Sequence, residues 1–282
     1  MFTSISCAST HPVKQDTPFL DSYVFTPDDG KPHPGIFMVH GSAGGAVSDM
    51  WVQAMYLVSH GFTVMTFCWF DCGRDALFEP AKPLAEIELQ KTIAAMKWFK
   101  ESPHVNGKKI GLFGISRGAE HALILASYQD RIPFKIDAVA VHAPSDVVVG
   151  GFSNNWIDKR CWICKRASPC EEKPENWNPS CGDINLGHKD PYKIPAWLWS
   201  GKALEIGQRI EIEKYAGPVF ITAGNDDAVW ESDRTRRIEK TLTSAGRRPE
   251  VHVFPNEGHA LKTAAEQKRK ELSASFFTRG LR

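Results

Sequence analysis

The sequence lacks any run of 18 or more apolar residues, so it predicts no membrane-spanning helix. Its N-terminus, Met1 to Cys7, has neither a basic start nor an apolar core of useful length, and it does not resemble a signal peptide. An excess of one charge is also lacking, because 34 Lys and Arg residues are spread along the chain with 33 Asp and Glu residues. Nucleic-acid binding requires clustered basic residues, so no nucleic-acid partner is expected. We therefore predict a cytoplasmic protein.

Internal repeats are lacking too, and short apolar runs instead alternate with longer amphipathic stretches. This alternation predicts an α/β fold with a mostly parallel sheet and helices on both faces, in a single domain spanning residues 1–282. The predicted strands are Gly35–His40, Phe62–Phe67, Lys109–Phe113, Ala138–Val141, Pro218–Thr222 and Val251–Phe254. The predicted helices are Val47–His60, Leu84–Lys100, a stretch after Ser116 through Tyr128, Ser232–Ala245 and a polar helix at the end of the chain.

The regular pattern breaks between about residues 147 and 201, a stretch rich in Cys, Trp, Pro and Asn. It is too long for a plain connection, and we predict a cap that closes over the site. The Trp residues of the cap suggest an aromatic substrate pocket, with Trp156, Trp162 and Trp197 as candidates. The alternative is that these large side chains only pack the cap itself.

Four cysteines of this stretch, Cys161, Cys164, Cys170 and Cys181, lie close together in the sequence. Their spacing matches no common zinc pattern well, and free thiols, two disulfides and a metal site all stay open. Disulfides would favour a periplasmic or secreted protein over a cytoplasmic one.

The run Gly114-Ile115-Ser116-Arg117-Gly118 lies between a predicted strand and a predicted helix. A serine hydroxyl is a poor nucleophile unless a tight turn exposes it beside a base. Glycines two residues to either side permit such a turn, because a Cβ there would clash. The pentapeptide alone is a weak signal, but its strand-to-helix context predicts Ser116 as a nucleophile.

A base and an orienting acid are expected later in the chain, in the order Ser, acid, His. His259 follows the last predicted strand, and two carboxylates, Asp226 and Asp227, follow the strand before it. Hydrolases with this order often carry Gly-x-x-Asp in that loop, which selects Asp227. His142, at the end of another strand, is a candidate pocket residue.

Acyl transfer also needs N–H donors for the oxyanion of the tetrahedral intermediate. One is expected at Arg117, directly after the nucleophile, and the other at Ser42 or Ala43 in the Gly-rich loop after the first central strand. That loop has neither Gly-x-Gly-x-x-Gly nor Gly-Lys-Ser/Thr, which argues against a phosphate site. No metal and no organic cofactor is implied.

The ordered set of His40-Gly41, Gly114 to Glu120, Gly224 to Asp227 and Gly258-His259 resembles the α/β-hydrolase superfamily. Residues 114–120, 196–204 and 224–232 are more specifically similar to the C-terminal catalytic domain of acyl-CoA thioesterases and bile-acid-CoA:amino acid N-acyltransferases. Dienelactone hydrolases are a more distant resemblance. The acyltransferase members use cysteine as nucleophile, whereas Ser116 favours transfer of the acyl group to water.

Together these features predict a serine hydrolase that cleaves small-molecule carboxylic esters, lactones or thioesters through an acyl-enzyme on Ser116. One alternative is an acyl-CoA thioesterase. An alternative from another class is a non-catalytic, ligand-binding protein with the same fold. The sequence leaves the oligomeric state open.

Overall fold

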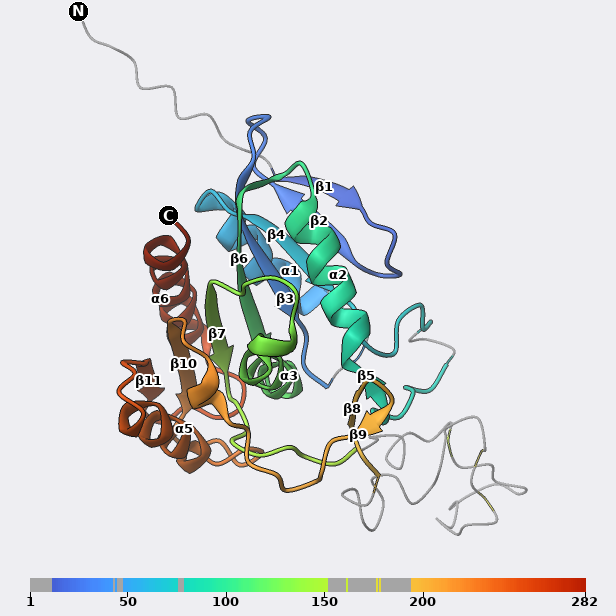
Figure 1. The fold of residues 1–282 in the computed structure, drawn as a ribbon, viewed down its shortest axis with the longest axis vertical. Helices are drawn as coiled ribbons and strands as arrows, with labels where there is room; N and C mark the ends of the chain where they lie inside the picture. The colour runs from blue at the N-terminus through green and yellow to red at the C-terminus, as the bar shows by residue number, and fades with distance from the viewer. Residues whose placement is uncertain are drawn as a thin grey trace, which may run out of the picture.

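The computed structural model describes residues 12–42, 44, 48–75, 79–151, 161, 176, 178 and 194–282. Within them an eight-stranded sheet runs through the molecule in the order β1-β2-β4-β3-β6-β7-β10-β11 (Figure 1). The strands are β1 (Val13–Asp16), β2 (Tyr23–Thr26), β3 (His33–Val39), β4 (Thr63–Phe67), β6 (Val105–Ile115), β7 (Ala138–His142), β10 (Val219–Gly224) and β11 (Glu250–Phe254). β2 pairs antiparallel with both β1 and β4, and the neighbours from β4 through β3, β6, β7 and β10 to β11 pair parallel.

Helices cover both faces of this sheet, as predicted. On one face lie α1 (Ser48–Ser59) and α6 (Thr263–Leu281), and on the other lie α2 (Leu89–Glu101), α3 (Arg117–Ser127) and α5 (Ser232–Ser244). β4, β7 and β10 are buried along their whole length, which explains their continuous apolar character in the sequence. All the catalytic candidates follow the carboxyl ends of parallel strands, so the sheet brings them to one edge.

The predicted start of the helix at Leu84 was wrong. Residues Ile87–Glu88 form a short strand, β5, and α2 begins only at Leu89. β5 pairs with β8 (Trp197–Trp199), which in turn pairs with β9 (Lys202–Ala203). The Ile87 N–H donates to the Ala196 carbonyl at 2.7 Å, a long-range bond that helical spacing cannot reveal.

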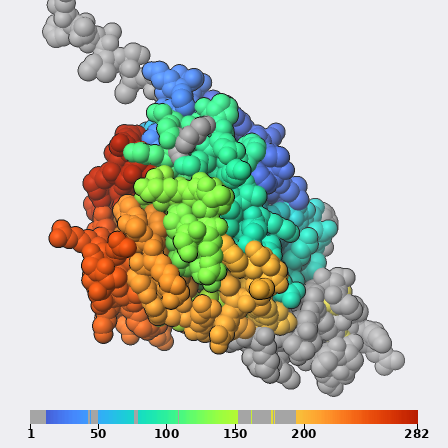
Figure 2. All heavy atoms as spheres, viewed as in Figure 1, coloured from blue at the N-terminus to red at the C-terminus, as the bar shows by residue number. Residues whose placement is uncertain are grey.

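The predicted cap begins and ends at one place in the structure. The Gly151 N–H donates to the carbonyl of Ile194 at 2.6 Å, which joins the outgoing and the returning chain. The returning segment packs against the chain after α3 in the space-filling view (Figure 2, amber against green). Trp156 and Trp162 lie outside the described residues, so their contact with substrate stays a prediction.

None of the described helices combines the length and the apolar character needed to cross a membrane.

Candidate active site

Ser116 sits in a tight turn between β6 and α3. Its φ of 55° lies in the left-handed region, which is strained for a residue with a side chain. Two glycines allow the turn: a Cβ on Gly114 would lie 2.2 Å from the Gly118 carbonyl oxygen, and a Cβ on Gly118 would lie 2.3 Å from that of Val39. The backbone segments around Ser116 thus approach one another so closely that both positions require glycine, as the pentapeptide predicts.

His259 and Asp227 lie next to Ser116. His259 Nε2 is 2.8 Å from Ser116 Oγ, and His259 Nδ1 is 2.8 Å from Asp227 Oδ2. A carboxylate only accepts, so Nδ1 carries the proton and Nε2 accepts from the serine hydroxyl. The arrangement leaves the lone pair of Nε2 directed at the one hydroxyl that has to lose its proton.

Burial and hydrogen bonding distinguish Asp227 from Asp226. Asp227 is buried, and its second oxygen, Oδ1, accepts the N–H groups of Val229 and Trp230 at 2.8 and 2.9 Å. Asp226 is exposed, and its carboxylate accepts a bond from its neighbour Asn225. The geometry therefore places Asp227, rather than Asp226, behind the imidazole.

His142 supports His259 from behind. Its Nε2 is 3.1 Å from the His259 carbonyl oxygen, and its Nδ1 is 3.0 Å from Thr222 Oγ1. Burial lowers the pKa of His142 to about 4, so the ring is neutral at pH 7. A neutral ring with Nε2–H donating to the carbonyl leaves Nδ1 to accept from the threonine hydroxyl. His142 thus fixes the backbone of the histidine loop.

A cavity of about 330 Å³ opens beside Ser116. Ser42, His142 and His259 line it, together with three apolar side chains and an ion pair between the half-buried Glu266 and the buried Arg269: Met50, Ile115, Leu261, Glu266 and Arg269. The predicted pocket residue His142 and the predicted oxyanion residue Ser42 both lie at this cavity. Ala43 lies outside the described residues, and its role stays a prediction.

The side chain of Arg117, which sequence reasoning did not single out, is buried under the elbow. Its Nη1 donates to Glu120 Oε2 at 2.7 Å, and its Nη2 donates to the Gly150 carbonyl at 2.9 Å. Glu120 Oε1 accepts the Val149 N–H and the Trp197 indole N–H, at 2.7 and 2.8 Å. The pair therefore joins the first turn of α3 to both ends of the predicted cap.

Trp197 belongs to this network and not to the cavity. It is fully buried and packs against Trp69 and His121, with ring centroids 5.0 and 4.7 Å away. The prediction that Trp197 contacts substrate is therefore corrected: its indole N–H needs a buried acceptor, and Glu120 provides it.

The cysteines give a mixed outcome. Cys68 and Cys72, which the sequence left unassigned, form a disulfide, and the buried Cys161 is disulfide-bonded as well. A free thiol and a zinc ligand are thereby excluded for Cys161, whereas Cys164, Cys170 and Cys181 lie outside the described residues. Among the residues that the structure describes, no group of three or more His, Cys, Asp or Glu side chains is arranged to hold a metal ion.

The comparison with known families finds one matching model, described as "BAAT / Acyl-CoA thioester hydrolase C terminal", over residues 88–264. Among individual relatives, a peroxisomal succinyl-coenzyme A thioesterase of Mus musculus is 26% identical over 250 residues. Acyl-coenzyme A thioesterase 6 of Homo sapiens is 24% identical over 246 residues. These alignments cover 85% and 84% of this chain but 51% of either relative, so the chain spans about half the length of these proteins.

Solved structures confirm the fold. A putative dienelactone hydrolase from Klebsiella pneumoniae superposes with a TM-score of 0.62 at 12% identity, over 96% of this chain and 99% of that one. Est1E from Butyrivibrio proteoclasticus, solved with ferulic acid, gives 0.59 at 18% identity, over 93% and 95%. The α/β-hydrolase fold predicted from the sequence is therefore correct.

Proposed function

Because the chain belongs to the BAAT/acyl-CoA thioester hydrolase C-terminal family, we propose that it is a serine hydrolase of carboxylic esters, lactones or thioesters. One observation carries the proposal: Asp227, His259 and Ser116 form a continuous hydrogen-bonded chain with 2.8 Å at each step. A nucleophile, its base and the orienter of that base are the groups that acyl transfer to water requires.

The first half of the reaction transfers the acyl group to the protein. His259 Nε2 takes the proton of Ser116 Oγ as this oxygen attacks the carbonyl carbon, and Asp227 stabilises the imidazolium. The backbone N–H of Arg117 and that of Ser42 or Ala43 stabilise the oxyanion, at about 3 kcal/mol each. The tetrahedral intermediate then collapses: the alkoxide or thiolate leaves with the proton from His259, and the acyl group stays on Ser116 as an ester.

The second half releases the acid. His259 takes a proton from water, the resulting hydroxide attacks the acyl carbon, and His259 returns the proton to Ser116 Oγ as the carboxylic acid departs. The cavity beside Ser116 offers the apolar walls of Met50, Ile115 and Leu261 to the acyl group. Every proton in the cycle is carried by this chain's own side chains.

A thioesterase acting on acyl-CoA is the more specific alternative, favoured by the names of the relatives. A panel of p-nitrophenyl esters, compared with medium- and long-chain acyl-CoAs, distinguishes the two substrate classes by kcat/KM. We expect ester turnover in either case, and negligible CoA release would contradict the thioesterase alternative.

The catalytic proposal itself is tested with Ser116→Ala and His259→Ala. Each variant should lose about 10³-fold or more in kcat and keep only residual catalysis from the oxyanion donors. A fluorophosphonate probe should label the wild type, with the adduct on Ser116 in a peptide map, and leave Ser116→Ala unlabelled. Absence of labelling would favour a non-catalytic, ligand-binding protein instead.

A further inference from the structure

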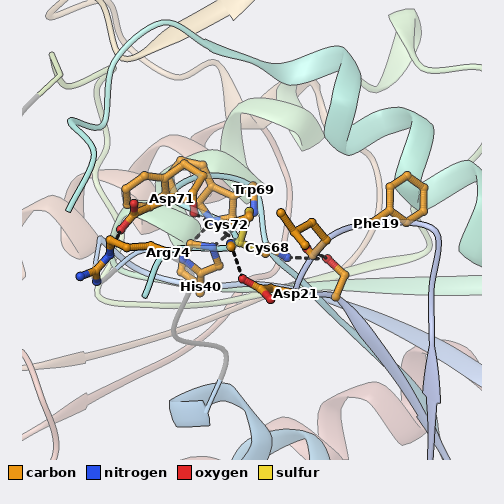
Figure 3. The surroundings of a disulfide bond; sticks show 12 residues. Phe19, Asp21, His40, Cys68, Trp69, Asp71, Cys72 and Arg74 are labelled. Atoms are coloured by element: carbon orange, nitrogen blue, oxygen red, sulfur yellow. Dashed lines mark hydrogen bonds and ion pairs between the residues drawn. A yellow bond between two sulfur atoms is a disulfide. The ribbon is translucent and has the colours of Figure 1, made fainter. Parts of the chain in front are cut away.

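The Cys68–Cys72 disulfide closes a small ring of backbone directly after β4. Figure 3 shows this ring lying against His40, the residue that begins the Gly-rich loop after β3. The Cys68 N–H donates to Ser22 Oγ at 3.0 Å, and the N–H of Gly73 donates to Asp21, so both ends of the ring are tied to the chain before β2. The ring is therefore held in place from one side and contacts the candidate site on the other.

Trp69, inside the ring, binds His40 in two ways. Its indole N–H donates to the His40 carbonyl at 2.9 Å, and its backbone N–H lies 3.3 Å from His40 Nε2. The imidazole of His40 and the indole of Trp69 are stacked, with ring centroids 5.1 Å apart. Backbone and side chain of one residue thus hold both the carbonyl and the imidazole of His40.

The imidazole of His40 passes this constraint on to the Gly-rich loop. Its Nδ1 is 2.8 Å from the Gly41 carbonyl oxygen, which can only accept, so Nδ1 carries the proton and Nε2 accepts from Trp69. Burial lowers the pKa of His40 to about 4, and the neutral ring keeps this tautomer at pH 7. Gly41 in turn approaches Ser116 so closely that a Cβ on it would lie 3.4 Å from that of Ser116.

Asp71 supplies a second contact from the ring to the same loop. A Cβ on Gly44 would lie 2.7 Å from Asp71 Oδ2, so the carboxylate packs directly on the loop backbone. The φ of Asp71 is 55°, a strained value that needs support from the surrounding structure. Arg74 Nε and the Lys82 N–H hold its carboxylate, at 2.6 and 3.0 Å.

We propose that the Cys68–Cys72 disulfide, through Trp69 and Asp71, holds residues 40–42 and Gly44 of the Gly-rich loop in the shape that stabilises the oxyanion, so that hydrolysis depends on the redox state of this pair. The inference rests on the proposed function, because it assigns these residues a positioning role in that reaction. Opening the ring frees the strained backbone at Asp71 and the two bonds of Trp69, while the triad beyond it keeps its own hydrogen bonds.

A dithiol reductant can reduce the Cys68–Cys72 disulfide. Cys68 is buried and Cys72 is half-buried, so the attacking thiolate reaches the sulfur of Cys72, forms a mixed disulfide and expels the Cys68 thiolate, which takes up a proton. The second thiol of the reductant then displaces Cys72 as its thiolate. The protein gains two electrons and two protons, and the reductant becomes a cyclic disulfide.

The test compares oxidised and dithiothreitol-reduced protein, with the reductant removed anaerobically because thiols cleave p-nitrophenyl esters themselves. Mass shifts after alkylation report the state of each cysteine. We expect reduction to lower kcat at least tenfold while KM changes less than threefold, since oxyanion contacts act in the transition state. Labelling of Ser116 by the fluorophosphonate probe should slow in parallel, and reoxidation should restore both.

Two variants assign the effect. Cys68→Ala/Cys72→Ala should have the low kcat of the reduced protein and no response to dithiothreitol; a response equal to that of the wild type would move the effect to another disulfide and overturn the proposal. Trp69→Phe, which keeps the stacking but loses the indole N–H, should lower kcat in the oxidised state.

Unchanged kcat after verified reduction, or loss of the far-UV circular dichroism signal on reduction, would also overturn the proposal. A lack of activity in the oxidised wild type would instead refute the proposed function.

Discussion

Asp227 and Asp226 are neighbours in the sequence, yet only one of them is built to orient an imidazole. The carboxylate of Asp227 is buried and accepts two backbone N–H groups besides His259. These bonds fix its orientation and stabilise its charge, which a buried carboxylate requires. The exposed Asp226 has freedom to turn and no contact that would order the histidine.

Asp227→Asn should therefore lower kcat by about 10³- to 10⁴-fold, because an amide that donates to Nδ1 favours the wrong tautomer of His259. Asp226→Asn is the matched control at the adjacent position and should stay within about threefold of the wild type. Steady-state kinetics on one p-nitrophenyl ester measures both. The reverse order of effects would assign the acid to Asp226.

The sequence predicted those residues of the candidate site that a local motif, or a position directly after a strand, identifies. Ser116 is marked by its flanking glycines, and His259 and Asp227 follow from the order of strands and loops. The contact between His40 and Trp69 was not predicted, because this contact joins residues 29 positions apart in the sequence. Nothing in the spacing of Cys68 and Cys72 separates a disulfide from two thiols, since pairing depends on the conformation of the turn between them.

At the scale of elements, the first turn of α3 connects the nucleophile to the predicted cap. Arg117 and Glu120 are one turn apart on the helix, both buried, and they bind the chain where it leaves the sheet and where it returns. Burial raises the pKa of Glu120, and the Arg117 guanidinium acts against that rise. A buried pair of this kind costs desolvation energy, so we attribute its presence to the geometry that it imposes.

Glu120→Gln should destabilise the protein by about 3–5 kcal/mol, because it removes the carboxylate that the buried Arg117 guanidinium pairs with at 2.7 Å. Glu213→Gln is the control, since Glu213 pairs with Arg209 at the surface and such pairs contribute about 1 kcal/mol or less. Urea unfolding followed by circular dichroism gives both values. Equal stabilities of the two variants would show that the Arg117–Glu120 pair does not act as a buried ion pair.

The sequence predicted the helices and strands that have their own apolar periodicity. It missed the strands that form only because they pair with a distant segment of the chain. The buried strands and the helices after them are evident from apolar patterns. The residues of β5 were predicted as helix because Leu84 and Ile87 fit helical spacing. The actual partner of Ile87, the returning chain at Ala196, is more than a hundred residues away in the sequence. β1 and β2 are short antiparallel strands at the edge of the sheet, too brief to give a pattern.

At the scale of the whole molecule, three buried histidines couple stability to pH. Burial lowers the pKa of His40 and of His142 to about 4, and that of His121 to about 3, from 6.5. Between pH 6.5 and about 4 the unfolded chain therefore binds more protons than the folded one. Stability contributed by these groups is complete above pH 6.5 and is lost as the pH falls toward their folded pKa values.

The free energy of unfolding should fall by roughly 4 kcal/mol per pH unit near pH 5, at about 1.4 kcal/mol for each histidine. His121→Phe should remove about a third of this slope, because neither ring nitrogen of His121 has a hydrogen-bond partner among the described residues and the phenyl ring retains the packing. Urea unfolding at pH 7.5, 6 and 5 checks the prediction. A slope unchanged by His121→Phe would contradict it, and the exposed His60→Gln serves as control.

Because β11 lies at the edge of the sheet, we expect the protein to lose its activity before it unfolds as a whole. His259 follows a strand with one neighbour in the described sheet, β10, and half-buried side chains throughout. Edge strands open in local fluctuations at a lower cost than the strands between them. We therefore expect His259 to lose its position beside Ser116 when β11 opens, while the turn at Ser116, which follows the central strand β6, keeps its structure. Mild heat or denaturant should thus abolish hydrolysis while most of the protein is still folded. The stability of β11, the last strand, would then limit the conditions under which the protein is active.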